Sequence, residues 1–172
     1  MSGGVDSAIA ALLLQKQGYA VEGLTLRMWH ANTSEQSGLD SAKLVASSIG
    51  IPLHVVDARE DFRQEVVQAF LQSHLDCETP NPCVYCNRVV KWNKLLEFAD
   101  QNESRFVATG HYARLLPADS GLIGLWRARD YSKDQSYMLS RLTQAELSRT
   151  IFPLGDLTKQ EVRQIAKESG LA

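Results

Sequence analysis

Apolar residues along this chain recur with helical and strand periods in alternation, separated by polar or glycine-containing breaks. Helical spacing predicts helices over residues 6–17, 39–49, 61–76, 88–100 and 158–170. Runs rich in branched apolar residues predict strands within 19–28, at 52–56 and at 105–109. The polar stretch 29–38 is expected to be a loop, and so is 77–87, because two prolines in three residues disfavour regular structure.

The last third of the chain adds a hairpin and short helical segments to this alternation. Apolar residues in 112–116 and 122–128, on either side of Asp119-Ser120-Gly121, predict two antiparallel strands. A polar stretch at 129–135 leads into short helical pieces that reach residue 149. The final helix is marked by Thr158 and Glu161, which have the spacing of a capping box.

Strands that alternate with helices predict an α/β fold, with a parallel sheet and helices on both of its faces. Ligands of such sheets bind beyond the carboxyl ends of the strands. This rule brings four segments to one edge, namely residues 1–7, the exit of the strand within 21–28, the exit at 55–59, and Thr109-Gly110-His111. Most of the polar and glycine-rich residues of the chain therefore belong to one candidate binding edge.

The first of these segments is a glycine loop that leads directly into a helix and reads Ser2-Gly3-Gly4-Val5-Asp6-Ser7. A glycine turn at a helix start exposes unpaired N–H groups and the positive end of the helix dipole, which together bind anions such as phosphate. Ser2 and Ser7 add hydroxyl donors, and Asp6 could hold a metal or polarise a nucleophile. The alternative is an ordinary glycine turn capped by a serine.

Bulk composition limits the classes of function. The chain has 172 residues, 44% of them hydrophobic, and a formal net charge of −2, so contact with RNA must come from a local patch. It contains no apolar run near the ~18 residues of a membrane span. Its start has a glycine loop where a signal peptide would have a basic region. We therefore expect no membrane association.

Two of the three cysteines form a Cys83-x-x-Cys86 pair in the proline-containing loop, just before a predicted helix. A helix N-terminus lowers the pKa of a thiol, so the pair is a candidate nucleophile, persulfide acceptor or metal site. The alternative is a pair of buried, inert cysteines. A zinc or iron–sulfur site normally needs four ligands, and the spacing of Cys77 from Cys83 fits no standard knuckle.

Two further groups of residues are candidates for binding. His111 follows Gly110 at a strand end on the binding edge, where a functional role competes with a structural one. Lys133, Asp134 and Gln135 form, with nearby arginines, a basic and hydrogen-bonding patch, although taken alone this patch favours the interpretation of a solvated hairpin end.

Several motifs together resemble one family, the tRNA-specific 2-thiouridylases of the ATP-pyrophosphatase (PP-loop) superfamily. They are the glycine loop 2–7, the Asn-Pro-Cys-Val-Tyr-Cys-Asn run at 81–87 with Lys91-Trp92, the segment 108–114, and the segment 133–137. Their order and spacing match over nearly the whole chain. The resemblance implies a Rossmann-like adenine nucleotide α-hydrolase sheet over residues 1–128, with the start of a helical tRNA-binding segment at 129–172.

By this resemblance, the enzyme activates C2 of the wobble uridine of tRNA by adenylation with ATP and Mg²⁺. Sulfur then arrives as a persulfide relayed from a partner protein, and the enzyme is cytoplasmic. Chemistry on a base edge agrees with this, since the base must be extruded into a pocket.

The resemblance also assigns roles to residues. The loop Ser2, Gly3, Gly4, Val5, Asp6 and Ser7 would hold the ATP pyrophosphate, with Leu26 and Gly110 on the adenine side. Asn81, Pro82 and Cys83 would line the pocket for the target base. Cys86 would be the catalytic nucleophile, together with Asp6 at the catalytic site. His111, Lys133, Asp134 and Gln135 would contact tRNA.

Three departures from the family pattern bear on function. Many members carry Asp where this chain has Cys83, which raises an alternative iron–sulfur or disulfide role for Cys83 and Cys86. The second catalytic cysteine of the family lies downstream of the position of Ala172, and in the family a strand precedes the glycine loop. We therefore expect a chain without its first strand that binds ATP but does not complete thiolation. A non-catalytic nucleotide- or RNA-binding fragment is a further alternative.

Overall fold

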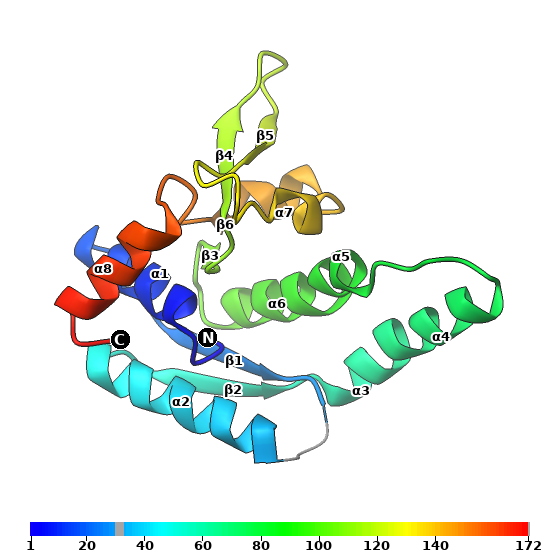
Figure 1. Cartoon of the computed structure of the whole chain (residues 1–172), viewed down its shortest axis with the longest axis horizontal. Coiled ribbons are helices and arrows are strands. Elements are labelled where there is room, and N and C mark those ends of the chain that lie inside the picture. Colours follow the sequence, from blue (N-terminus) through cyan, green and yellow to red (C-terminus); the bar gives the residue numbers. More distant parts are fainter. Residues whose placement is uncertain (30–32, 172) are drawn as a thin grey trace.

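The computed structural model describes residues 1–29 and 33–171, without the side chains of residues 33–37. A βαβ unit forms its first half. Strand β1 (Gly23–Arg27) pairs in parallel with β2 (Leu53–Asp57), and helix α2 (Thr33–Ile49) connects them. Helix α1 (Val5–Lys16) precedes the unit, and in Figure 1 α2 runs along β2. The expected helix at 6–17 and the expected strands within 19–28 and at 52–56 are confirmed.

Helices cover both faces of the β1–β2 pair, as the α/β prediction requires. Leu53 packs in a cluster with Ala11 of α1 and Ala46 of α2. The ring of the next residue, His54, contacts Phe98 of helix α6 (Asn93–Gln101), with the two ring centroids 4.8 Å apart and the planes tilted by 51°. Because successive side chains of a strand point to opposite faces, α6 covers the face opposite to α1 and α2.

A second parallel pair is formed by two short strands, β3 (Val107–Ala108) and β6 (Thr150–Ile151). Among the described residues this pair is not hydrogen-bonded to the first, so the sheet consists of separate pieces rather than one continuous layer. The expected strand at 105–109 is present but short, and β6 was not predicted. Two residues are too few to show strand periodicity in a sequence.

The hairpin and the final helix are confirmed. Strands β4 (Ala113–Pro117) and β5 (Ile123–Arg127) are antiparallel, and Gly121 has a positive φ of 77° in the turn. The segments after it are η3 (Ser136–Leu139) and α7 (Gln144–Ser148). Helix α8 (Lys159–Glu168) begins with the predicted capping box and packs on α1. The shared apolar cluster contains Ile9, Ala10, Tyr112, Ala128, Leu154, Val162 and Ala166.

Two expected loops contain helix. Helix α2 begins at Thr33, within the stretch predicted as irregular, while residues 30–32 lie outside the described part. Thr33 and Gln36 have the spacing of a helix start, and a glycine inside a helix costs only about 1 kcal/mol. The polar character of this stretch therefore does not exclude a helix.

The proline-containing loop is also shorter than expected. Helix α5 (Pro82–Cys86) continues through the π-helical segment η2 (Asn87–Trp92) into α6. Pro82 is the first helical residue, where proline is tolerated because its missing N–H would have no partner there. The Asn81 side chain caps this end and accepts a hydrogen bond from the Val84 N–H at 3.4 Å. The preceding helical stretch, predicted at 61–76, runs through α3 (Arg59–Asp61), η1 (Phe62–Val67) and α4 (Gln68–Leu75).

Candidate nucleotide site and cysteine helix

The glycine loop folds as an open helix N-terminus. Gly4 is the N-cap of α1 and has no side chain to occupy the free N–H groups of the first turn. The Ser7 hydroxyl donates to the Gly4 carbonyl at 2.9 Å, and the Ser2 and Ser7 hydroxyl oxygens are 3.3 Å apart. Backbone N–H groups and two hydroxyls thus gather at the positive end of a helix, which is the arrangement of an anion site.

Two glycines allow the backbone to close around this loop. Gly3 has a φ of 76°, and a Cβ there would lie 2.7 Å from the Cβ of Ser41 in α2. A Cβ on Gly110 would lie 2.8 Å from the carbonyl carbon of Asp6 and 2.9 Å from the nitrogen of Ser7. The expected meeting of the loop with Gly110 is therefore present, and it is a direct backbone contact.

The strand exit at Leu26 lies beside the same loop. The Thr25 hydroxyl donates to the Met1 carbonyl at 2.8 Å, which places the start of the loop against β1. Leu26 is the next residue and is half-buried. The segment 1–6 thus lies between β1 on one side and Gly110, after β3, on the other.

Asp6 is held by two residues that sequence reasoning did not identify. The Lys159 ammonium lies 2.6 Å from Oδ1 and 2.7 Å from Oδ2 of Asp6, and the Tyr112 hydroxyl donates to Oδ1 at 2.9 Å. Burial, and then the Asp6 carboxylate, raise the pKa of Tyr112, so the phenol stays protonated. The sequence around Lys159 does not indicate a contact with Asp6, although Lys159 directly follows the predicted N-cap Thr158.

The residues of the loop fit a nucleotide better than a free metal ion. The N–H groups, hydroxyls and close-packed glycines suit phosphate oxygens. Among the described residues, no group of three His, Cys, Asp or Glu side chains could hold a metal. Mg²⁺ commonly binds through one or two carboxylates together with the substrate phosphates, and Asp6 is the one acidic side chain of the loop sequence.

Cys86 is buried rather than exposed at a helix N-terminus. It packs with Met28, Ala58 and Val90, so it lies near the carboxyl ends of β1 and β2. Burial raises the pKa of the Cys86 thiol, while the Lys91 ammonium opposes this rise. For Cys86 the expectation of a lowered thiol pKa is therefore wrong, because the helix begins at Pro82 and Cys86 lies at the end of its first segment.

Lys91 lies on the Cys86 side because of the helix geometry between them. A π-helix forms i→i+5 hydrogen bonds, and Lys91 is five residues after Cys86. Lys91 forms no ion pair with any residue of the described part of the chain. Its charge is therefore available to a thiolate or another anion formed at Cys86.

Replacing Lys91 with Met is expected to slow alkylation of Cys86 by iodoacetamide several-fold at pH 8, because the thiolate loses its nearby cation. Peptide mass spectrometry would follow Cys86 separately from Cys77 and Cys83. Arg88→Met is the matched control, since the Arg88 guanidinium contacts Glu146 at 3.9 Å. Equal Cys86 rates in the wild type and Lys91→Met across pH 7–10 would contradict the effect.

The other residues assigned to the base pocket lie at the start of the same helix. Asn81 and Cys83 are exposed, and Pro82 is half-buried. All three cysteines of the chain lie in its described part and are free thiols, so the alternative disulfide between Cys83 and Cys86 is not formed in this structure. Cys83 and Cys86 also lack a third His, Cys, Asp or Glu side chain close enough, among the described residues, to complete a cluster site.

His111 is neutral and packed in an aromatic cluster. Its ring centroid is 5.8 Å from Trp92 and 6.4 Å from Phe152, and its Nδ1 lies 2.8 Å from the Thr109 hydroxyl. Burial, and then the Lys91 charge, lower the pKa of His111 to about 4. It can therefore offer a hydrogen bond near neutral pH but no positive charge.

The segment 133–135 combines internal contacts with one exposed cation. Asp134 accepts hydrogen bonds from the Ala128 N–H and the Ser136 hydroxyl, both at 2.9 Å. The Gln135 side chain accepts one from the Tyr112 N–H at 3.1 Å. Lys133 is exposed. Asp134 and Gln135 thus shape the loop, whereas the Lys133 side chain is exposed to solvent.

The fold and the glycine-loop site define an α/β domain of the HUP class, and residues 1–172 match the family described as "tRNA methyl transferase HUP domain". A predicted subunit of a tRNA methyltransferase from Methanocaldococcus jannaschii has a similar structure. The two structures align with a TM-score of 0.56 and 22% sequence identity, and the alignment covers 96% of this chain and 72% of the other. At this identity the likeness supports the fold alone.

Sequence relatives identify the family. The tRNA-specific 2-thiouridylase MnmA of Syntrophotalea carbinolica is 49% identical over 99% of this chain and 49% of its own length. The MnmA of Natranaerobius thermophilus is 44% identical over 99% of this chain and 50% of its own length. The chain belongs to the tRNA-specific 2-thiouridylase family, and it spans about half the length of these curated relatives.

Proposed function

We propose that this chain binds ATP and tRNA for the adenylation step of tRNA 2-thiolation. One observation in a member of this family carries the proposal. The glycine loop leaves the N–H groups at the N-terminus of α1 without a side-chain cap, and Gly110 packs directly against the backbone of Asp6 and Ser7. None of the helices in the described part of the chain is long and apolar enough to cross a membrane.

Each side of the site has a defined task in this proposal. The N–H groups of Val5, Asp6 and Ser7 and the Ser2 and Ser7 hydroxyls would bind the phosphates. Asp6 would hold Mg²⁺, which would neutralise part of the phosphate charge. Backbone groups of Leu26 and Gly110 contact the adenine side. When bound, ATP supplies an adenylyl group to the O2 oxygen of the wobble uridine, and pyrophosphate leaves.

The tRNA side comes from two segments. One is the helix formed by α5 and η2, residues 82–92, which carries Cys83 and Cys86 and is called the cysteine helix below, and the other is the segment after the β4–β5 hairpin. Asn81, Pro82 and Cys83 line the pocket of the extruded uridine at the exposed start of α5. Cys86 acts as the nucleophile, and a persulfide-carrying partner protein supplies the sulfur. His111 and the segment Lys133-Asp134-Gln135 contact tRNA. Residues 129–172 thus begin the tRNA-binding part, and 1–128 form the catalytic part.

A cavity of about 520 Å³ next to that segment supports an RNA contact there. Arg127, Tyr131, Asp134, Ser136 and Tyr137 line it, and the Tyr131 and Tyr137 side chains are 73% and 53% exposed. Exposed aromatic rings beside cationic groups are typical of surfaces that stack unpaired bases.

The experiment that tests the proposal is exchange of labelled pyrophosphate into ATP, catalysed by the 172-residue chain with tRNA. We expect exchange with tRNA that carries a wobble uridine and none with a transcript that carries cytidine there. ATP binding without exchange would favour a non-catalytic nucleotide-binding chain. Iron uptake with a visible absorption band during anaerobic reconstitution would favour the iron–sulfur alternative at Cys83 and Cys86.

A further inference from the structure

Arg141 lies over the aromatic ring of Tyr85, which belongs to the cysteine helix. Its guanidinium carbon is 5.3 Å from the ring centroid, and Arg141 is exposed. Tyr85 is half-buried, packs against the cluster that contains Cys86, and stands one residue before that cysteine. A cation over the face of an aromatic ring is attracted to it electrostatically, so Arg141 is held beside Cys86 without a hydrogen bond.

Buried contacts on both sides fix the position of Arg141. Leu139 and Leu142 flank it and are buried, and the Leu142 N–H donates to the Leu139 carbonyl at 3.0 Å. The amide nitrogen of the buried Asn87 side chain donates to the Met138 carbonyl at 2.9 Å, which holds η3 against the cysteine helix. The backbone of Arg141 is therefore ordered in advance, which lowers the entropy cost of binding a ligand.

The charge of Arg141 has no acidic partner. Within the described part of the chain Arg141 forms neither an ion pair nor a hydrogen bond through its side chain, whereas the Arg88 guanidinium contacts Glu146 at 3.9 Å. A guanidinium with free N–H donors suits bidentate contact with a phosphate group. RNA is the polyanion that the proposed function brings to this surface.

Arg141 joins the two surfaces that the proposed function assigns to tRNA. The base-pocket residues 81–83 stand at the start of the helix that carries Tyr85. Ser136 and Tyr137 of η3 line the cavity of about 520 Å³, and Arg141 follows the end of η3 by two residues. A single-stranded RNA that reached both the pocket and the cavity would pass this guanidinium.

We propose that Arg141, held over Tyr85, binds a backbone phosphate of the tRNA anticodon loop. This inference rests on the proposed function, and it adds a residue outside the motifs that carry the family resemblance. The charge of Arg141 supplies affinity, and the Tyr85 ring limits the orientations of the guanidinium. The ligand class is the phosphodiester backbone of unpaired RNA.

Fluorescence anisotropy with a labelled anticodon stem-loop RNA, titrated with the 172-residue chain at several salt concentrations, tests the proposal. Arg141→Met is expected to weaken binding about fivefold to tenfold at ~50 mM salt, because one charge-assisted contact is lost. The slope of log Kd against log salt concentration should fall by about 0.7, the contribution of one phosphate of a single strand. Arg141→Lys should keep that slope and lose about two- to threefold in affinity, because an ammonium lacks the planar fork.

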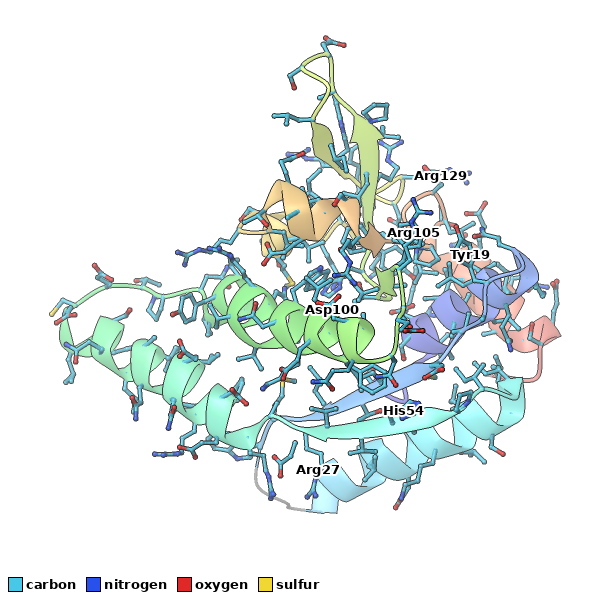
Figure 2. All side chains as sticks on the ribbon, turned by 180° about the vertical axis from the view of Figure 1, so that it is seen from behind. Tyr19, Arg27, His54, Asp100, Arg105 and Arg129 are labelled. Atoms are coloured by element: carbon cyan, nitrogen blue, oxygen red, sulfur yellow. The ribbon has the colours of Figure 1, made fainter. Side chains whose placement is uncertain are left out.

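Arg105→Met is the matched control. The Arg105 guanidinium also lies over an aromatic ring, with its carbon 5.0 Å from the centroid of Phe106, and Arg105 is exposed. It lies near Tyr19 in Figure 2 and precedes β3, at the amino end of that strand. Because ligands bind beyond the carboxyl ends of parallel strands, Arg105→Met should change neither the affinity nor the salt slope.

The salt slope separates a phosphate contact from an effect on the fold, and thermal unfolding shows that each variant is folded. A wild-type slope in Arg141→Met would overturn the inference even if the affinity fell, since no phosphate contact would have been lost. Equal losses for Arg105→Met and Arg141→Met would also overturn it, because any surface cation would then serve. A wild-type chain that binds no stem-loop RNA would overturn the tRNA part of the proposed function and this inference with it.

Discussion

Replacing Gly110 with alanine is expected to remove most ATP binding and to destabilise the fold. The new Cβ would lie 2.8 Å from the Asp6 carbonyl carbon and 2.9 Å from the Ser7 nitrogen. Both atoms are backbone of the first turn of α1, so no flexible side chain can move aside. The turn that presents the phosphate-binding N–H groups must shift, and such overpacking costs about 1–3 kcal/mol.

Calorimetric titration with ATP and urea unfolding would measure the two effects of Gly110→Ala. Gly38→Ala is the matched control, because Gly38 lies within α2 and a Cβ there would meet nothing within 4 Å. That control should gain about 0.5–1 kcal/mol of stability and bind ATP unchanged. Wild-type ATP affinity in Gly110→Ala would show that the close contact does not shape the site.

The binding edge could be predicted from sequence because it depends on local patterns. Glycines before a helix, and a glycine after a short strand, identified the loop 2–7 and Gly110. The rule that parallel strands present their carboxyl ends together then brought these segments into one site. It did not predict that Gly110 touches the backbone of Asp6, since such a distance depends on the packing of α1 against β3.

Contacts between distant segments account for what the sequence could not show. Lys159 meets Asp6 only because α8 packs on α1, and no local pattern records that packing. The two-residue strand β6 has the same origin, because it exists through its pairing with β3. Tertiary partners, rather than local propensity, decide both features.

The cysteine helix shows how a correct rule can be applied at the wrong position. Proline is disfavoured in the interior of a helix but is common at its first residue. Pro82 therefore begins a helix where a loop was expected. This moves Cys86 one turn into the helix and into an apolar cluster, which raises its pKa. A thiolate at Cys86 therefore depends on the Lys91 charge, which opposes the effect of burial.

Replacing Trp92 with alanine is expected to cause the largest loss of stability in this chain, about 3–5 kcal/mol. Trp92 is fully buried, and its indole N–H donates to the Thr150 hydroxyl at 2.9 Å. Its ring contacts Phe152 at 6.1 Å and His111 at 5.8 Å. One side chain thus joins the cysteine helix to β6 and to the segment after β3. Globular domains are stable by only about 5–15 kcal/mol, so this variant should be largely unfolded at moderate urea concentrations.

Two variants would resolve the origin of that loss in urea unfolding curves. Thr150→Val leaves the buried indole N–H without its acceptor and should cost about 1–3 kcal/mol, while the packing of the ring remains. Trp126→Ala removes a tryptophan that is 49% exposed. Its loss of unfolding free energy should be several-fold smaller than that of Trp92→Ala. Equal losses for Trp92→Ala and Trp126→Ala would contradict the assignment of Trp92 as the residue that joins the cysteine helix to β6 and to the segment after β3. Thr150→Val could unfold at a lower urea concentration than the wild type and still bind ATP with wild-type affinity while folded. In that case the contacts of Trp92 stabilise the fold without shaping the glycine loop.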